Sequence, residues 1–218
     1  MLMLVDDDPL VRTGLRFMLE SADDLRVAGE AGSGEDAVAL AQGGGFDLVL
    51  MDLRMPGMGG IAATSAIRAL TTPPHVIALT TWDVDDVVLA ALEAGAAGFL
   101  LKTSAPQEIL GAIRAVMAGD AVLSPRSTRQ LLDQLGRSSA LPQQRAAQQA
   151  VARLTPRERE VAVAVARGLT NAAIGAALYL AEPTVKTYVA AVQAKLGVAN
   201  RVGIAVLVER AGLLDEQP

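Results

Sequence analysis

Residues 48–52 read Leu-Val-Leu-Met-Asp, a run of four apolar residues that ends in a carboxylate. Such a short, uniformly apolar run is typical of a strand that is buried on both faces, as in a parallel sheet. Working outward from it, the first 119 residues contain five short segments that read as strands, and the segments between them have helical periodicity. The runs are Leu2 to Val5, Arg26 to Glu30, Leu48 to Met51, Val76 to Leu79 and Gly98 to Leu101. This alternation predicts a doubly wound α/β domain with a five-stranded parallel sheet over residues 1–119.

The chain changes character after residue 119. Ser124-Pro125 predicts the start of a short helix that runs to about Leu135, and residues 136–150 are polar and rich in Gln and Ser. Residues 120–150 are therefore interpreted as a linker with one short helix. Residues 151–214 contain four segments of helical pattern, and we expect a small all-α domain there. Their starts are marked by Thr155-Pro156, Thr170, Glu182-Pro183 and Asn200.

Composition narrows the class of protein. With 218 residues and 51% hydrophobic residues, the chain can build packed cores. No apolar run approaches the roughly 20 residues that span a bilayer, so we expect a cytoplasmic protein with no membrane partner. The absence of cysteine excludes disulfides and thiolate metal sites. Residues 1–119 carry 16 acidic and 7 basic side chains, whereas residues 151–210 carry 4 acidic and 8 basic ones, which indicates an acidic module joined to a basic one.

Polar side chains follow four of the five predicted strands at their carboxyl ends. Asp6 and Asp7 follow the first strand, Asp52 ends the third, Thr80 the fourth and Lys102 the fifth. Because the carboxyl ends of parallel strands lie at one edge of a sheet, we expect these groups to converge. Converging carboxylates repel one another unless a cation lies among them, and oxygen ligands suit Mg²⁺. A carboxylate beside Mg²⁺ is a nucleophile for phosphorus, with the Lys102 ammonium and the Thr80 hydroxyl available to the phosphoryl oxygens. Each residue alone is as readily a cap or loop residue, so the prediction depends on their joint placement.

About residues 170–196, from Thr170 to Leu196, the sequence has the pattern of a helix, a tight turn and a second helix. In the second helix, Val185, Val189, Val192 and Leu196 form one apolar stripe that we expect in the core. The outward face then carries small and polar side chains that suit a DNA major groove, with basic residues nearby for phosphates. The candidate DNA-binding residues are Thr184, Lys186, Thr187, Ala190, Lys195 and Arg201. A four-helix domain that binds protein explains the helical pattern equally well, so the pattern alone leaves both open.

Four segments of the first part resemble the receiver domain of two-component response regulators, which has a flavodoxin-like fold. They are Leu4-Val-Asp-Asp-Asp-Pro-Leu, Val49-Leu-Met-Asp-Leu-Arg-Met-Pro-Gly-Met, Ala78-Leu-Thr-Thr-Trp-Asp and Gly98-Phe-Leu-Leu-Lys102. The resemblance implies that Asp52 is the phosphoacceptor and that Asp6, Asp7 and Asp52 hold Mg²⁺ with help from the Arg54 carbonyl. It also implies that Thr80 is the switch hydroxyl, that Lys102 contacts the phosphoryl group and that Phe99 is the switch aromatic. Asp8 and Gly59 depart from the usual pattern without removing a pocket group.

The last part resembles the LuxR-type helix-turn-helix domain, through Leu154-Thr-Pro-Arg-Glu-Arg-Glu-Val, Arg167-Gly-Leu-Thr-Asn-Ala-Ala-Ile, Thr184-Val-Lys-Thr and Lys195-Leu-Gly-Val. Together the two parts are similar to the NarL/FixJ class of response regulators. That resemblance implies a transcription regulator and not a dedicated enzyme. Its implied partners are a sensor histidine kinase, promoter DNA, RNA polymerase and a second copy of the chain on DNA. Tyr188, Ala181, Ala190 and Ala191 differ from residues frequent in the class.

Two other functions remain alternatives. A regulator that uses the same DNA-binding domain without phosphorylation is one, because an intact pocket does not prove its use. A Mg²⁺-dependent hydrolase with an aspartyl-phosphate intermediate is the other. Such enzymes usually need an acid/base carboxylate two residues after the nucleophile, where this chain has Arg54, so this alternative is disfavoured.

Overall fold

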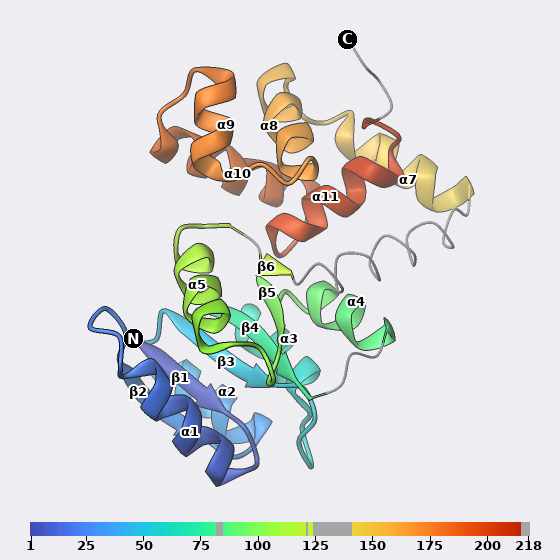
Figure 1. The fold of residues 1–218 in the computed structure, drawn as a ribbon. Helices are drawn as coiled ribbons and strands as arrows, with labels where there is room; N and C mark the ends of the chain where they lie inside the picture. Colours follow the sequence, from blue (N-terminus) through green and yellow to red (C-terminus); the bar gives the residue numbers. More distant parts are fainter. Residues whose placement is uncertain (82–84, 121, 124–140, 215–218) are drawn as a thin grey trace. The chain divides into compact units, whose positions relative to one another are not determined.

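The computed structural model describes residues 1–81, 85–120, 122–123 and 141–214 (Figure 1). The chain divides into two compact units. The first contains Met1–Ala118 together with strand β6, Val122–Leu123. The second contains, among the described residues, 119–120 and 141–214.

The first unit is built on a parallel sheet of order β2-β1-β3-β4-β5-β6. Its strands are β1 (Leu2–Val5), β2 (Val27–Ala31), β3 (Leu48–Asp52), β4 (His75–Thr80), β5 (Gly98–Leu101) and β6. Its helices are α1 (Pro9–Leu19), α2 (Gly34–Gln42), α3 (Gly60–Arg68), α4 (Asp85–Glu93) and α5 (Pro106–Met117). The predicted five-stranded parallel sheet is confirmed, and the two-residue β6 pairs with β5 as an addition at the edge.

Alternation along β3 explains why the sheet is covered on both faces. Leu48 and Leu50 pack in one hydrophobic cluster with side chains of α1 and α5, whereas Val49 and Met51 pack in another with side chains of α2 and α3. Successive residues of a strand point to opposite faces, so a run that is apolar at every position buries both faces. The doubly wound arrangement predicted from these runs is therefore confirmed.

The second unit is all helical. Its helices are α7 (Leu141–Val151), α8 (Pro156–Ala166), α9 (Asn171–Leu178), α10 (Glu182–Leu196) and α11 (Arg201–Arg210). Thr155, Thr170 and Asn200 cap α8, α9 and α11 with side-chain oxygens, as their positions in the sequence predicted. The core contains buried residues of all five of these helices, and Val161, Ile174, Val185 and Ile204 in it are 0% exposed. In the part of the chain that the structure describes, no helix can cross a membrane by itself, and only α10 and α11 taken together, bent by 61°, satisfy the length and composition for a span.

The predicted linker differs from the structure in its second part. The sequence predicts polar linker over residues 136–150, but α7 covers all of the described part of that range, residues 141–150. Ala147 and Val151, which are 1% and 3% exposed, lie one turn apart on α7 and pack into the helical core. Two small apolar residues at this spacing make a stripe too narrow to stand out among the surrounding glutamines. The short helix predicted between Ser124 and Leu135 lies outside the described residues.

Candidate phosphoacceptor and nucleic-acid sites

The carboxyl edge of the sheet brings together the polar residues that the sequence placed at strand ends. Asp52 ends β3 and Thr80 ends β4, while Asp6 and Lys102 follow β1 and β5 directly. Parallel pairing sets Asp52 beside Leu79 and Thr80 beside Leu101, so these strand ends are in step. Asp6, Asp52 and Thr80 are 1%, 4% and 1% exposed. The structure thus places Asp6, Asp52, Thr80 and Lys102 at the same edge of the parallel sheet.

Lys102 links the two buried carboxylates. Its Nζ lies 2.6 Å from Asp6 Oδ2 and 2.9 Å from Asp52 Oδ2. Burial raises the pKa of the Asp52 carboxyl above its usual value, and the hydrogen bond and charge of Lys102 oppose that rise. Burial alone would lower the pKa of Lys102, but the two carboxylates outweigh it and raise that pKa. The ammonium is therefore held in its charged form beside the carboxylate.

The three predicted metal ligands lie close enough to share one ion. Carboxylate oxygens of Asp6, Asp7 and Asp52 all lie within 4.8 Å of one another, and Asp7 faces solvent. Against the single positive charge of Lys102, these three groups leave an excess of negative charge that a divalent cation would balance. The oxygen-only donor set, open on the Asp7 side, fits Mg²⁺.

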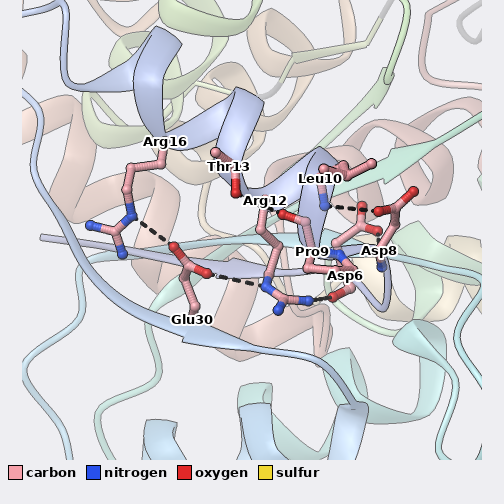
Figure 2. A network of polar contacts seen from close by, with 8 residues as sticks. All are labelled: Asp6, Asp8, Pro9, Leu10, Arg12, Thr13, Arg16 and Glu30. Carbon is pink, nitrogen blue, oxygen red and sulfur yellow. Dashed lines mark hydrogen bonds and ion pairs between the residues drawn. The ribbon is translucent and has the colours of Figure 1, made fainter.

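Backbone N–H groups hold the carboxylates in place. The backbone N–H of Arg54 donates to Asp52 Oδ1 at 3.3 Å, and that of Asp8 donates to Asp6 Oδ1 at 3.0 Å. Asp8 in turn caps α1 by accepting from the Leu10 N–H at 2.8 Å, as Figure 2 shows. Phe99, the predicted switch aromatic, is fully buried in β5 at 0% exposure.

One residue near this site was missed by sequence reasoning. The Arg12 guanidinium on α1 donates from Nη1 to the backbone carbonyl of Asp6 at 2.6 Å (Figure 2). The only signal available in the sequence was the spacing of Arg12 and Arg16, which puts two cations on one face of a predicted helix. That spacing by itself is typical of a solvated helix face.

In the helical unit, α10 presents the face that its sequence predicted. Val185, Val189 and Val192 are buried, whereas Thr184, Lys186, Thr187 and Ala190 are exposed. Lys186 Nζ lies 3.5 Å from Glu182 Oε1, and both side chains are nearly half exposed, so this pair holds the ammonium only weakly. The Thr187 hydroxyl donates to the Pro183 carbonyl at 3.1 Å.

The other two predicted DNA-binding cations, Lys195 and Arg201, form closer ion pairs with acidic residues outside α10. Lys195 Nζ lies 2.7 Å from Glu158 Oε2, although the Lys195 side chain keeps 41% of its surface exposed. Arg201 is only 8% exposed, and its Nη1 donates to Asp120 Oδ1 at 2.8 Å and to Asn171 Oδ1 at 3.1 Å. This burial argues against the predicted phosphate contact of Arg201. The sequence could not reveal it, because Asp120 is far from Arg201 along the chain.

The turn between α9 and α10 has an unusual residue. Tyr179 ends α9 with φ of 55°, in the left-handed region, and its side chain is 96% exposed. Among the described residues it is the one non-glycine with positive φ. Glycine or asparagine is usual in this conformation, so nothing in the sequence marked Tyr179 as a cap.

Comparison with known proteins matches both units to families. Residues 2–114 match the response regulator receiver domain, and residues 152–208 match the bacterial regulatory proteins of the luxR family. The transcriptional regulatory protein LiaR of Bacillus subtilis (strain 168) is 40% identical over 215 residues, which is 98% of each chain. The chain belongs to the NarL/FixJ class of two-component response regulators.

Other relatives are similar to this response regulator over nearly its whole length. The nitrate/nitrite response regulator protein NarL of Escherichia coli (strain K12) is 35% identical and aligns with 96% of this chain and 94% of its own. The crystal structure of the response regulator ChrA of a heme-sensing two-component system has a TM-score of 0.52 at 35% identity, covering 97% of both chains. This response regulator thus joins a receiver to a LuxR-type DNA-binding domain, and its relatives are transcriptional regulators.

Proposed function

We propose that a partner sensor histidine kinase phosphorylates Asp52 and that this modification controls the binding of promoter DNA by α10. The observation that carries the proposal is the position of Lys102, whose ammonium lies 2.9 Å from the buried Asp52 carboxylate at the carboxyl edge of the sheet. The receiver family supplies the kind of donor. The exposed face of α10 supplies the output.

The side chains of the site divide the work of phosphoryl transfer. One Asp52 oxygen forms the new P–O bond while the P–N bond of the donor phosphohistidine breaks, and the leaving imidazole keeps the electron pair and takes up a proton. Lys102 then contacts one phosphoryl oxygen, and Thr80 donates its hydroxyl to another. Phe99 fills the space beside Thr80 when that hydroxyl moves, which links the pocket to the surface of the receiver.

The proposed phosphorylation of Asp52 also requires a divalent metal ion at the carboxylate cluster. Asp6, Asp7 and Asp52 would hold Mg²⁺ through carboxylate oxygens, with the Arg54 carbonyl as a further ligand. When bound, Mg²⁺ supplies charge neutralisation for a phosphoryl oxygen. The chain carries the phosphoryl group as a signal, so we propose no dedicated enzyme activity beyond loss of the phosphoryl group to water.

The test compares the wild type with Asp52→Asn, which removes the nucleophile and keeps the size of the side chain. Each protein is incubated with Mg²⁺ with or without acetyl phosphate, and intact mass reports phosphorylation. Genomic DNA fragments are then captured at one fixed salt concentration. We expect one added phosphoryl group and stronger DNA capture for the wild type with the donor, and neither change for Asp52→Asn.

Two results would contradict parts of the proposal. Equal DNA capture in all four samples would leave a DNA-binding regulator without a phosphorylation switch. Phosphorylation of Asp52→Asn at the wild-type rate would move the acceptor to another residue.

The DNA-contacting set that we propose is Thr184, Lys186, Thr187 and Ala190, with Lys195 as a further phosphate contact when it leaves Glu158. The affinity for DNA falls as salt rises, and removing one phosphate contact should make the plot of log affinity against log salt concentration less steep by about 1. We therefore expect Lys186→Ala to make this plot less steep for the captured fragment. Arg153→Ala, which removes an exposed cation outside α10, is the matched control. Equal slopes for wild type and Lys186→Ala would exclude Lys186 as a phosphate contact.

The remaining partners follow from the class of regulator. We propose that the chain acts in the cytoplasm and binds DNA as a homodimer on two half-sites about one helical turn apart. RNA polymerase is the partner through which bound dimers alter transcription. Sedimentation of the phosphorylated protein on a duplex with one or two copies of the captured site measures the stoichiometry, and one chain per two-site duplex would refute the dimer.

A further inference from the structure

Two arginines of α1 form ion pairs with one carboxylate of β2. Arg12 Nε lies 3.1 Å from Glu30 Oε2, and Arg16 Nε lies 2.7 Å from Glu30 Oε1, as Figure 2 shows. We call Arg12, Arg16 and Glu30 the α1 clasp. Burial is partial, with the Arg12 and Glu30 side chains 19% and 28% exposed, so water screens the pairs incompletely. The arginines lower the pKa of Glu30, and the carboxylate stays charged.

Arg12 makes one contact that Arg16 does not. Its Nη1 donates to the carbonyl oxygen of Asp6 at 2.6 Å, so the same guanidinium joins Glu30 to the first predicted metal ligand. This carbonyl belongs to the peptide plane that connects Asp6 to Asp7. Because a peptide plane is rigid, a bond that fixes its oxygen restricts the backbone rotation on both sides of it.

The location makes this restriction important. Strand β1 ends at Val5 and α1 begins at Pro9, so Asp6 and Asp7 lie in a three-residue connection beyond the regular pairing of the strand. The Asp6 N–H still donates to the Ala31 carbonyl at 3.2 Å, and the Asp6 carboxylate accepts from the Asp8 N–H. Arg12 supplies the hydrogen bond at the remaining end of the Asp6 residue, its carbonyl.

We propose that Arg12 is a positioning residue for the metal site, which holds the peptide between Asp6 and Asp7 so that both carboxylates face Asp52. Glu30 orients the Arg12 guanidinium for this bond. The inference rests on the proposed Mg²⁺ site. It assigns to α1 a role in metal affinity, although none of its side chains belongs to the predicted ligand set.

The competing explanation is that the clasp only fastens α1 to the sheet. Arg16 separates the two explanations, because it contacts the same Glu30 carboxylate and lacks the bond to Asp6. Removing either arginine takes one cation from Glu30. Only removal of Arg12 releases the Asp6 carbonyl.

The experiment is a calorimetric titration of the unphosphorylated full-length protein with MgCl₂. Loss of a residue that orients a metal ligand typically weakens affinity by about 10- to 100-fold, and we expect about 10-fold for Arg12→Ala because the bond is to the backbone of the ligand residue. Arg16→Ala should weaken it by less than about threefold, as expected when a partly exposed ion pair is lost. Arg12→Lys should fall between them, because an ammonium lacks the planar fork that reaches Glu30 and Asp6 together. Urea denaturation of each variant reports its stability separately.

The outcomes distinguish the inference from the proposal beneath it. Equal weakening of Mg²⁺ binding by Arg12→Ala and Arg16→Ala, or no weakening by Arg12→Ala, would overturn the positioning role while leaving the metal site in place. A wild-type protein that binds no Mg²⁺ would refute the site itself.

Discussion

Gly60, the first residue of α3, packs against the backbone of the proposed phosphoacceptor. A Cβ placed on Gly60 would lie 1.9 Å from the Asp52 carbonyl oxygen and 2.8 Å from the Leu53 Cα. Ordinary contact begins at 3.4 Å, so α3 and the end of β3 would have to separate by about 1.5 Å at this point. The colliding atoms are backbone and cannot rotate away. Gly60→Ala is therefore expected to displace Asp52.

The expected size of the effect follows from two opposing contributions. Overpacking typically destabilises by about 1–3 kcal/mol, and a collision with backbone lies at the upper end. Alanine also restricts the unfolded chain and favours helix, which offsets about 0.5–1 kcal/mol. We expect Gly60→Ala to lower the free energy of unfolding of the receiver by about 2 kcal/mol. Gly14→Ala in the interior of α1 is the matched control, because a Cβ there meets nothing within 4 Å, and it should stabilise by about 0.4–1 kcal/mol.

Urea denaturation followed by circular dichroism measures the free energy of unfolding. The initial rate of phosphorylation from acetyl phosphate measures the effect of the displacement on the reactivity of Asp52. A misplacement of about 1 Å in a reacting group can cost about 100-fold in rate, so we expect a loss of that order for Gly60→Ala and none for Gly14→Ala. If Gly60→Ala matched the wild type in both stability and rate, the backbone at Asp52 would have to yield freely, and the reasoning from close packing would be wrong.

Three further predictions concern the helical unit. Ile174 is 0% exposed in its core, so Ile174→Ala should lower the free energy of unfolding of this unit by about 2–5 kcal/mol in urea, and a smaller loss would mean that the core collapses around the cavity. Hydrogen bonds from Lys195, the largest cause, and from Thr155 lower the pKa of Glu158 from 4.5 to about 2. The stabilising contribution of the Glu158 carboxylate is therefore complete above pH 4.5 and disappears as the pH falls through 2. Glu158→Gln should make the free energy of unfolding of the unit less dependent on pH between 2 and 4.5. The same pH dependence in the wild type and in Glu158→Gln would show that Glu158 is not the group responsible. Tyr179→Gly should raise stability by up to about 1 kcal/mol, because glycine adopts the left-handed conformation without steric cost; a lower midpoint would reveal a stabilising contact of the phenol ring.

The placement of polar groups at the proposed phosphoacceptor site could be predicted because it depends on the topology of the sheet. Once residues 48–52 are taken as a buried parallel strand, Asp52 must lie at the carboxyl edge, and the equivalent ends of the other strands bring Asp6, Thr80 and Lys102 to it. The same argument could not find Arg12. Its contact with Asp6 depends on how a long side chain bends back over its own helix, and the chain pattern does not encode this.

The two features that differ from the sequence-based expectation, helix α7 and the burial of Arg201, also depend on contacts formed only in the folded chain. Helix α7 is stabilised by packing of small residues such as Ala147 against the rest of its unit, a contribution that no local pattern of hydrophobicity records. The sequence predicts a DNA phosphate contact for Arg201 because it is a basic residue close after the predicted recognition helix, but in the fold it is buried and donates hydrogen bonds to Asp120 and Asn171. Charge can be counted in a sequence, whereas burial of a charge depends on distant partners.

Each hydrophobic cluster draws its described side chains from one unit only, residues 2–116 for the two faces of the sheet and residues 147–214 for the helical core. In a scanning calorimeter the chain should therefore show two heat-absorption events in place of one. Each event should have its own van't Hoff enthalpy, and the total calorimetric enthalpy should exceed either of them. Substitution of Gly60 should shift one event and substitution of Ile174 the other, so a single melting temperature for the whole chain would describe neither unit.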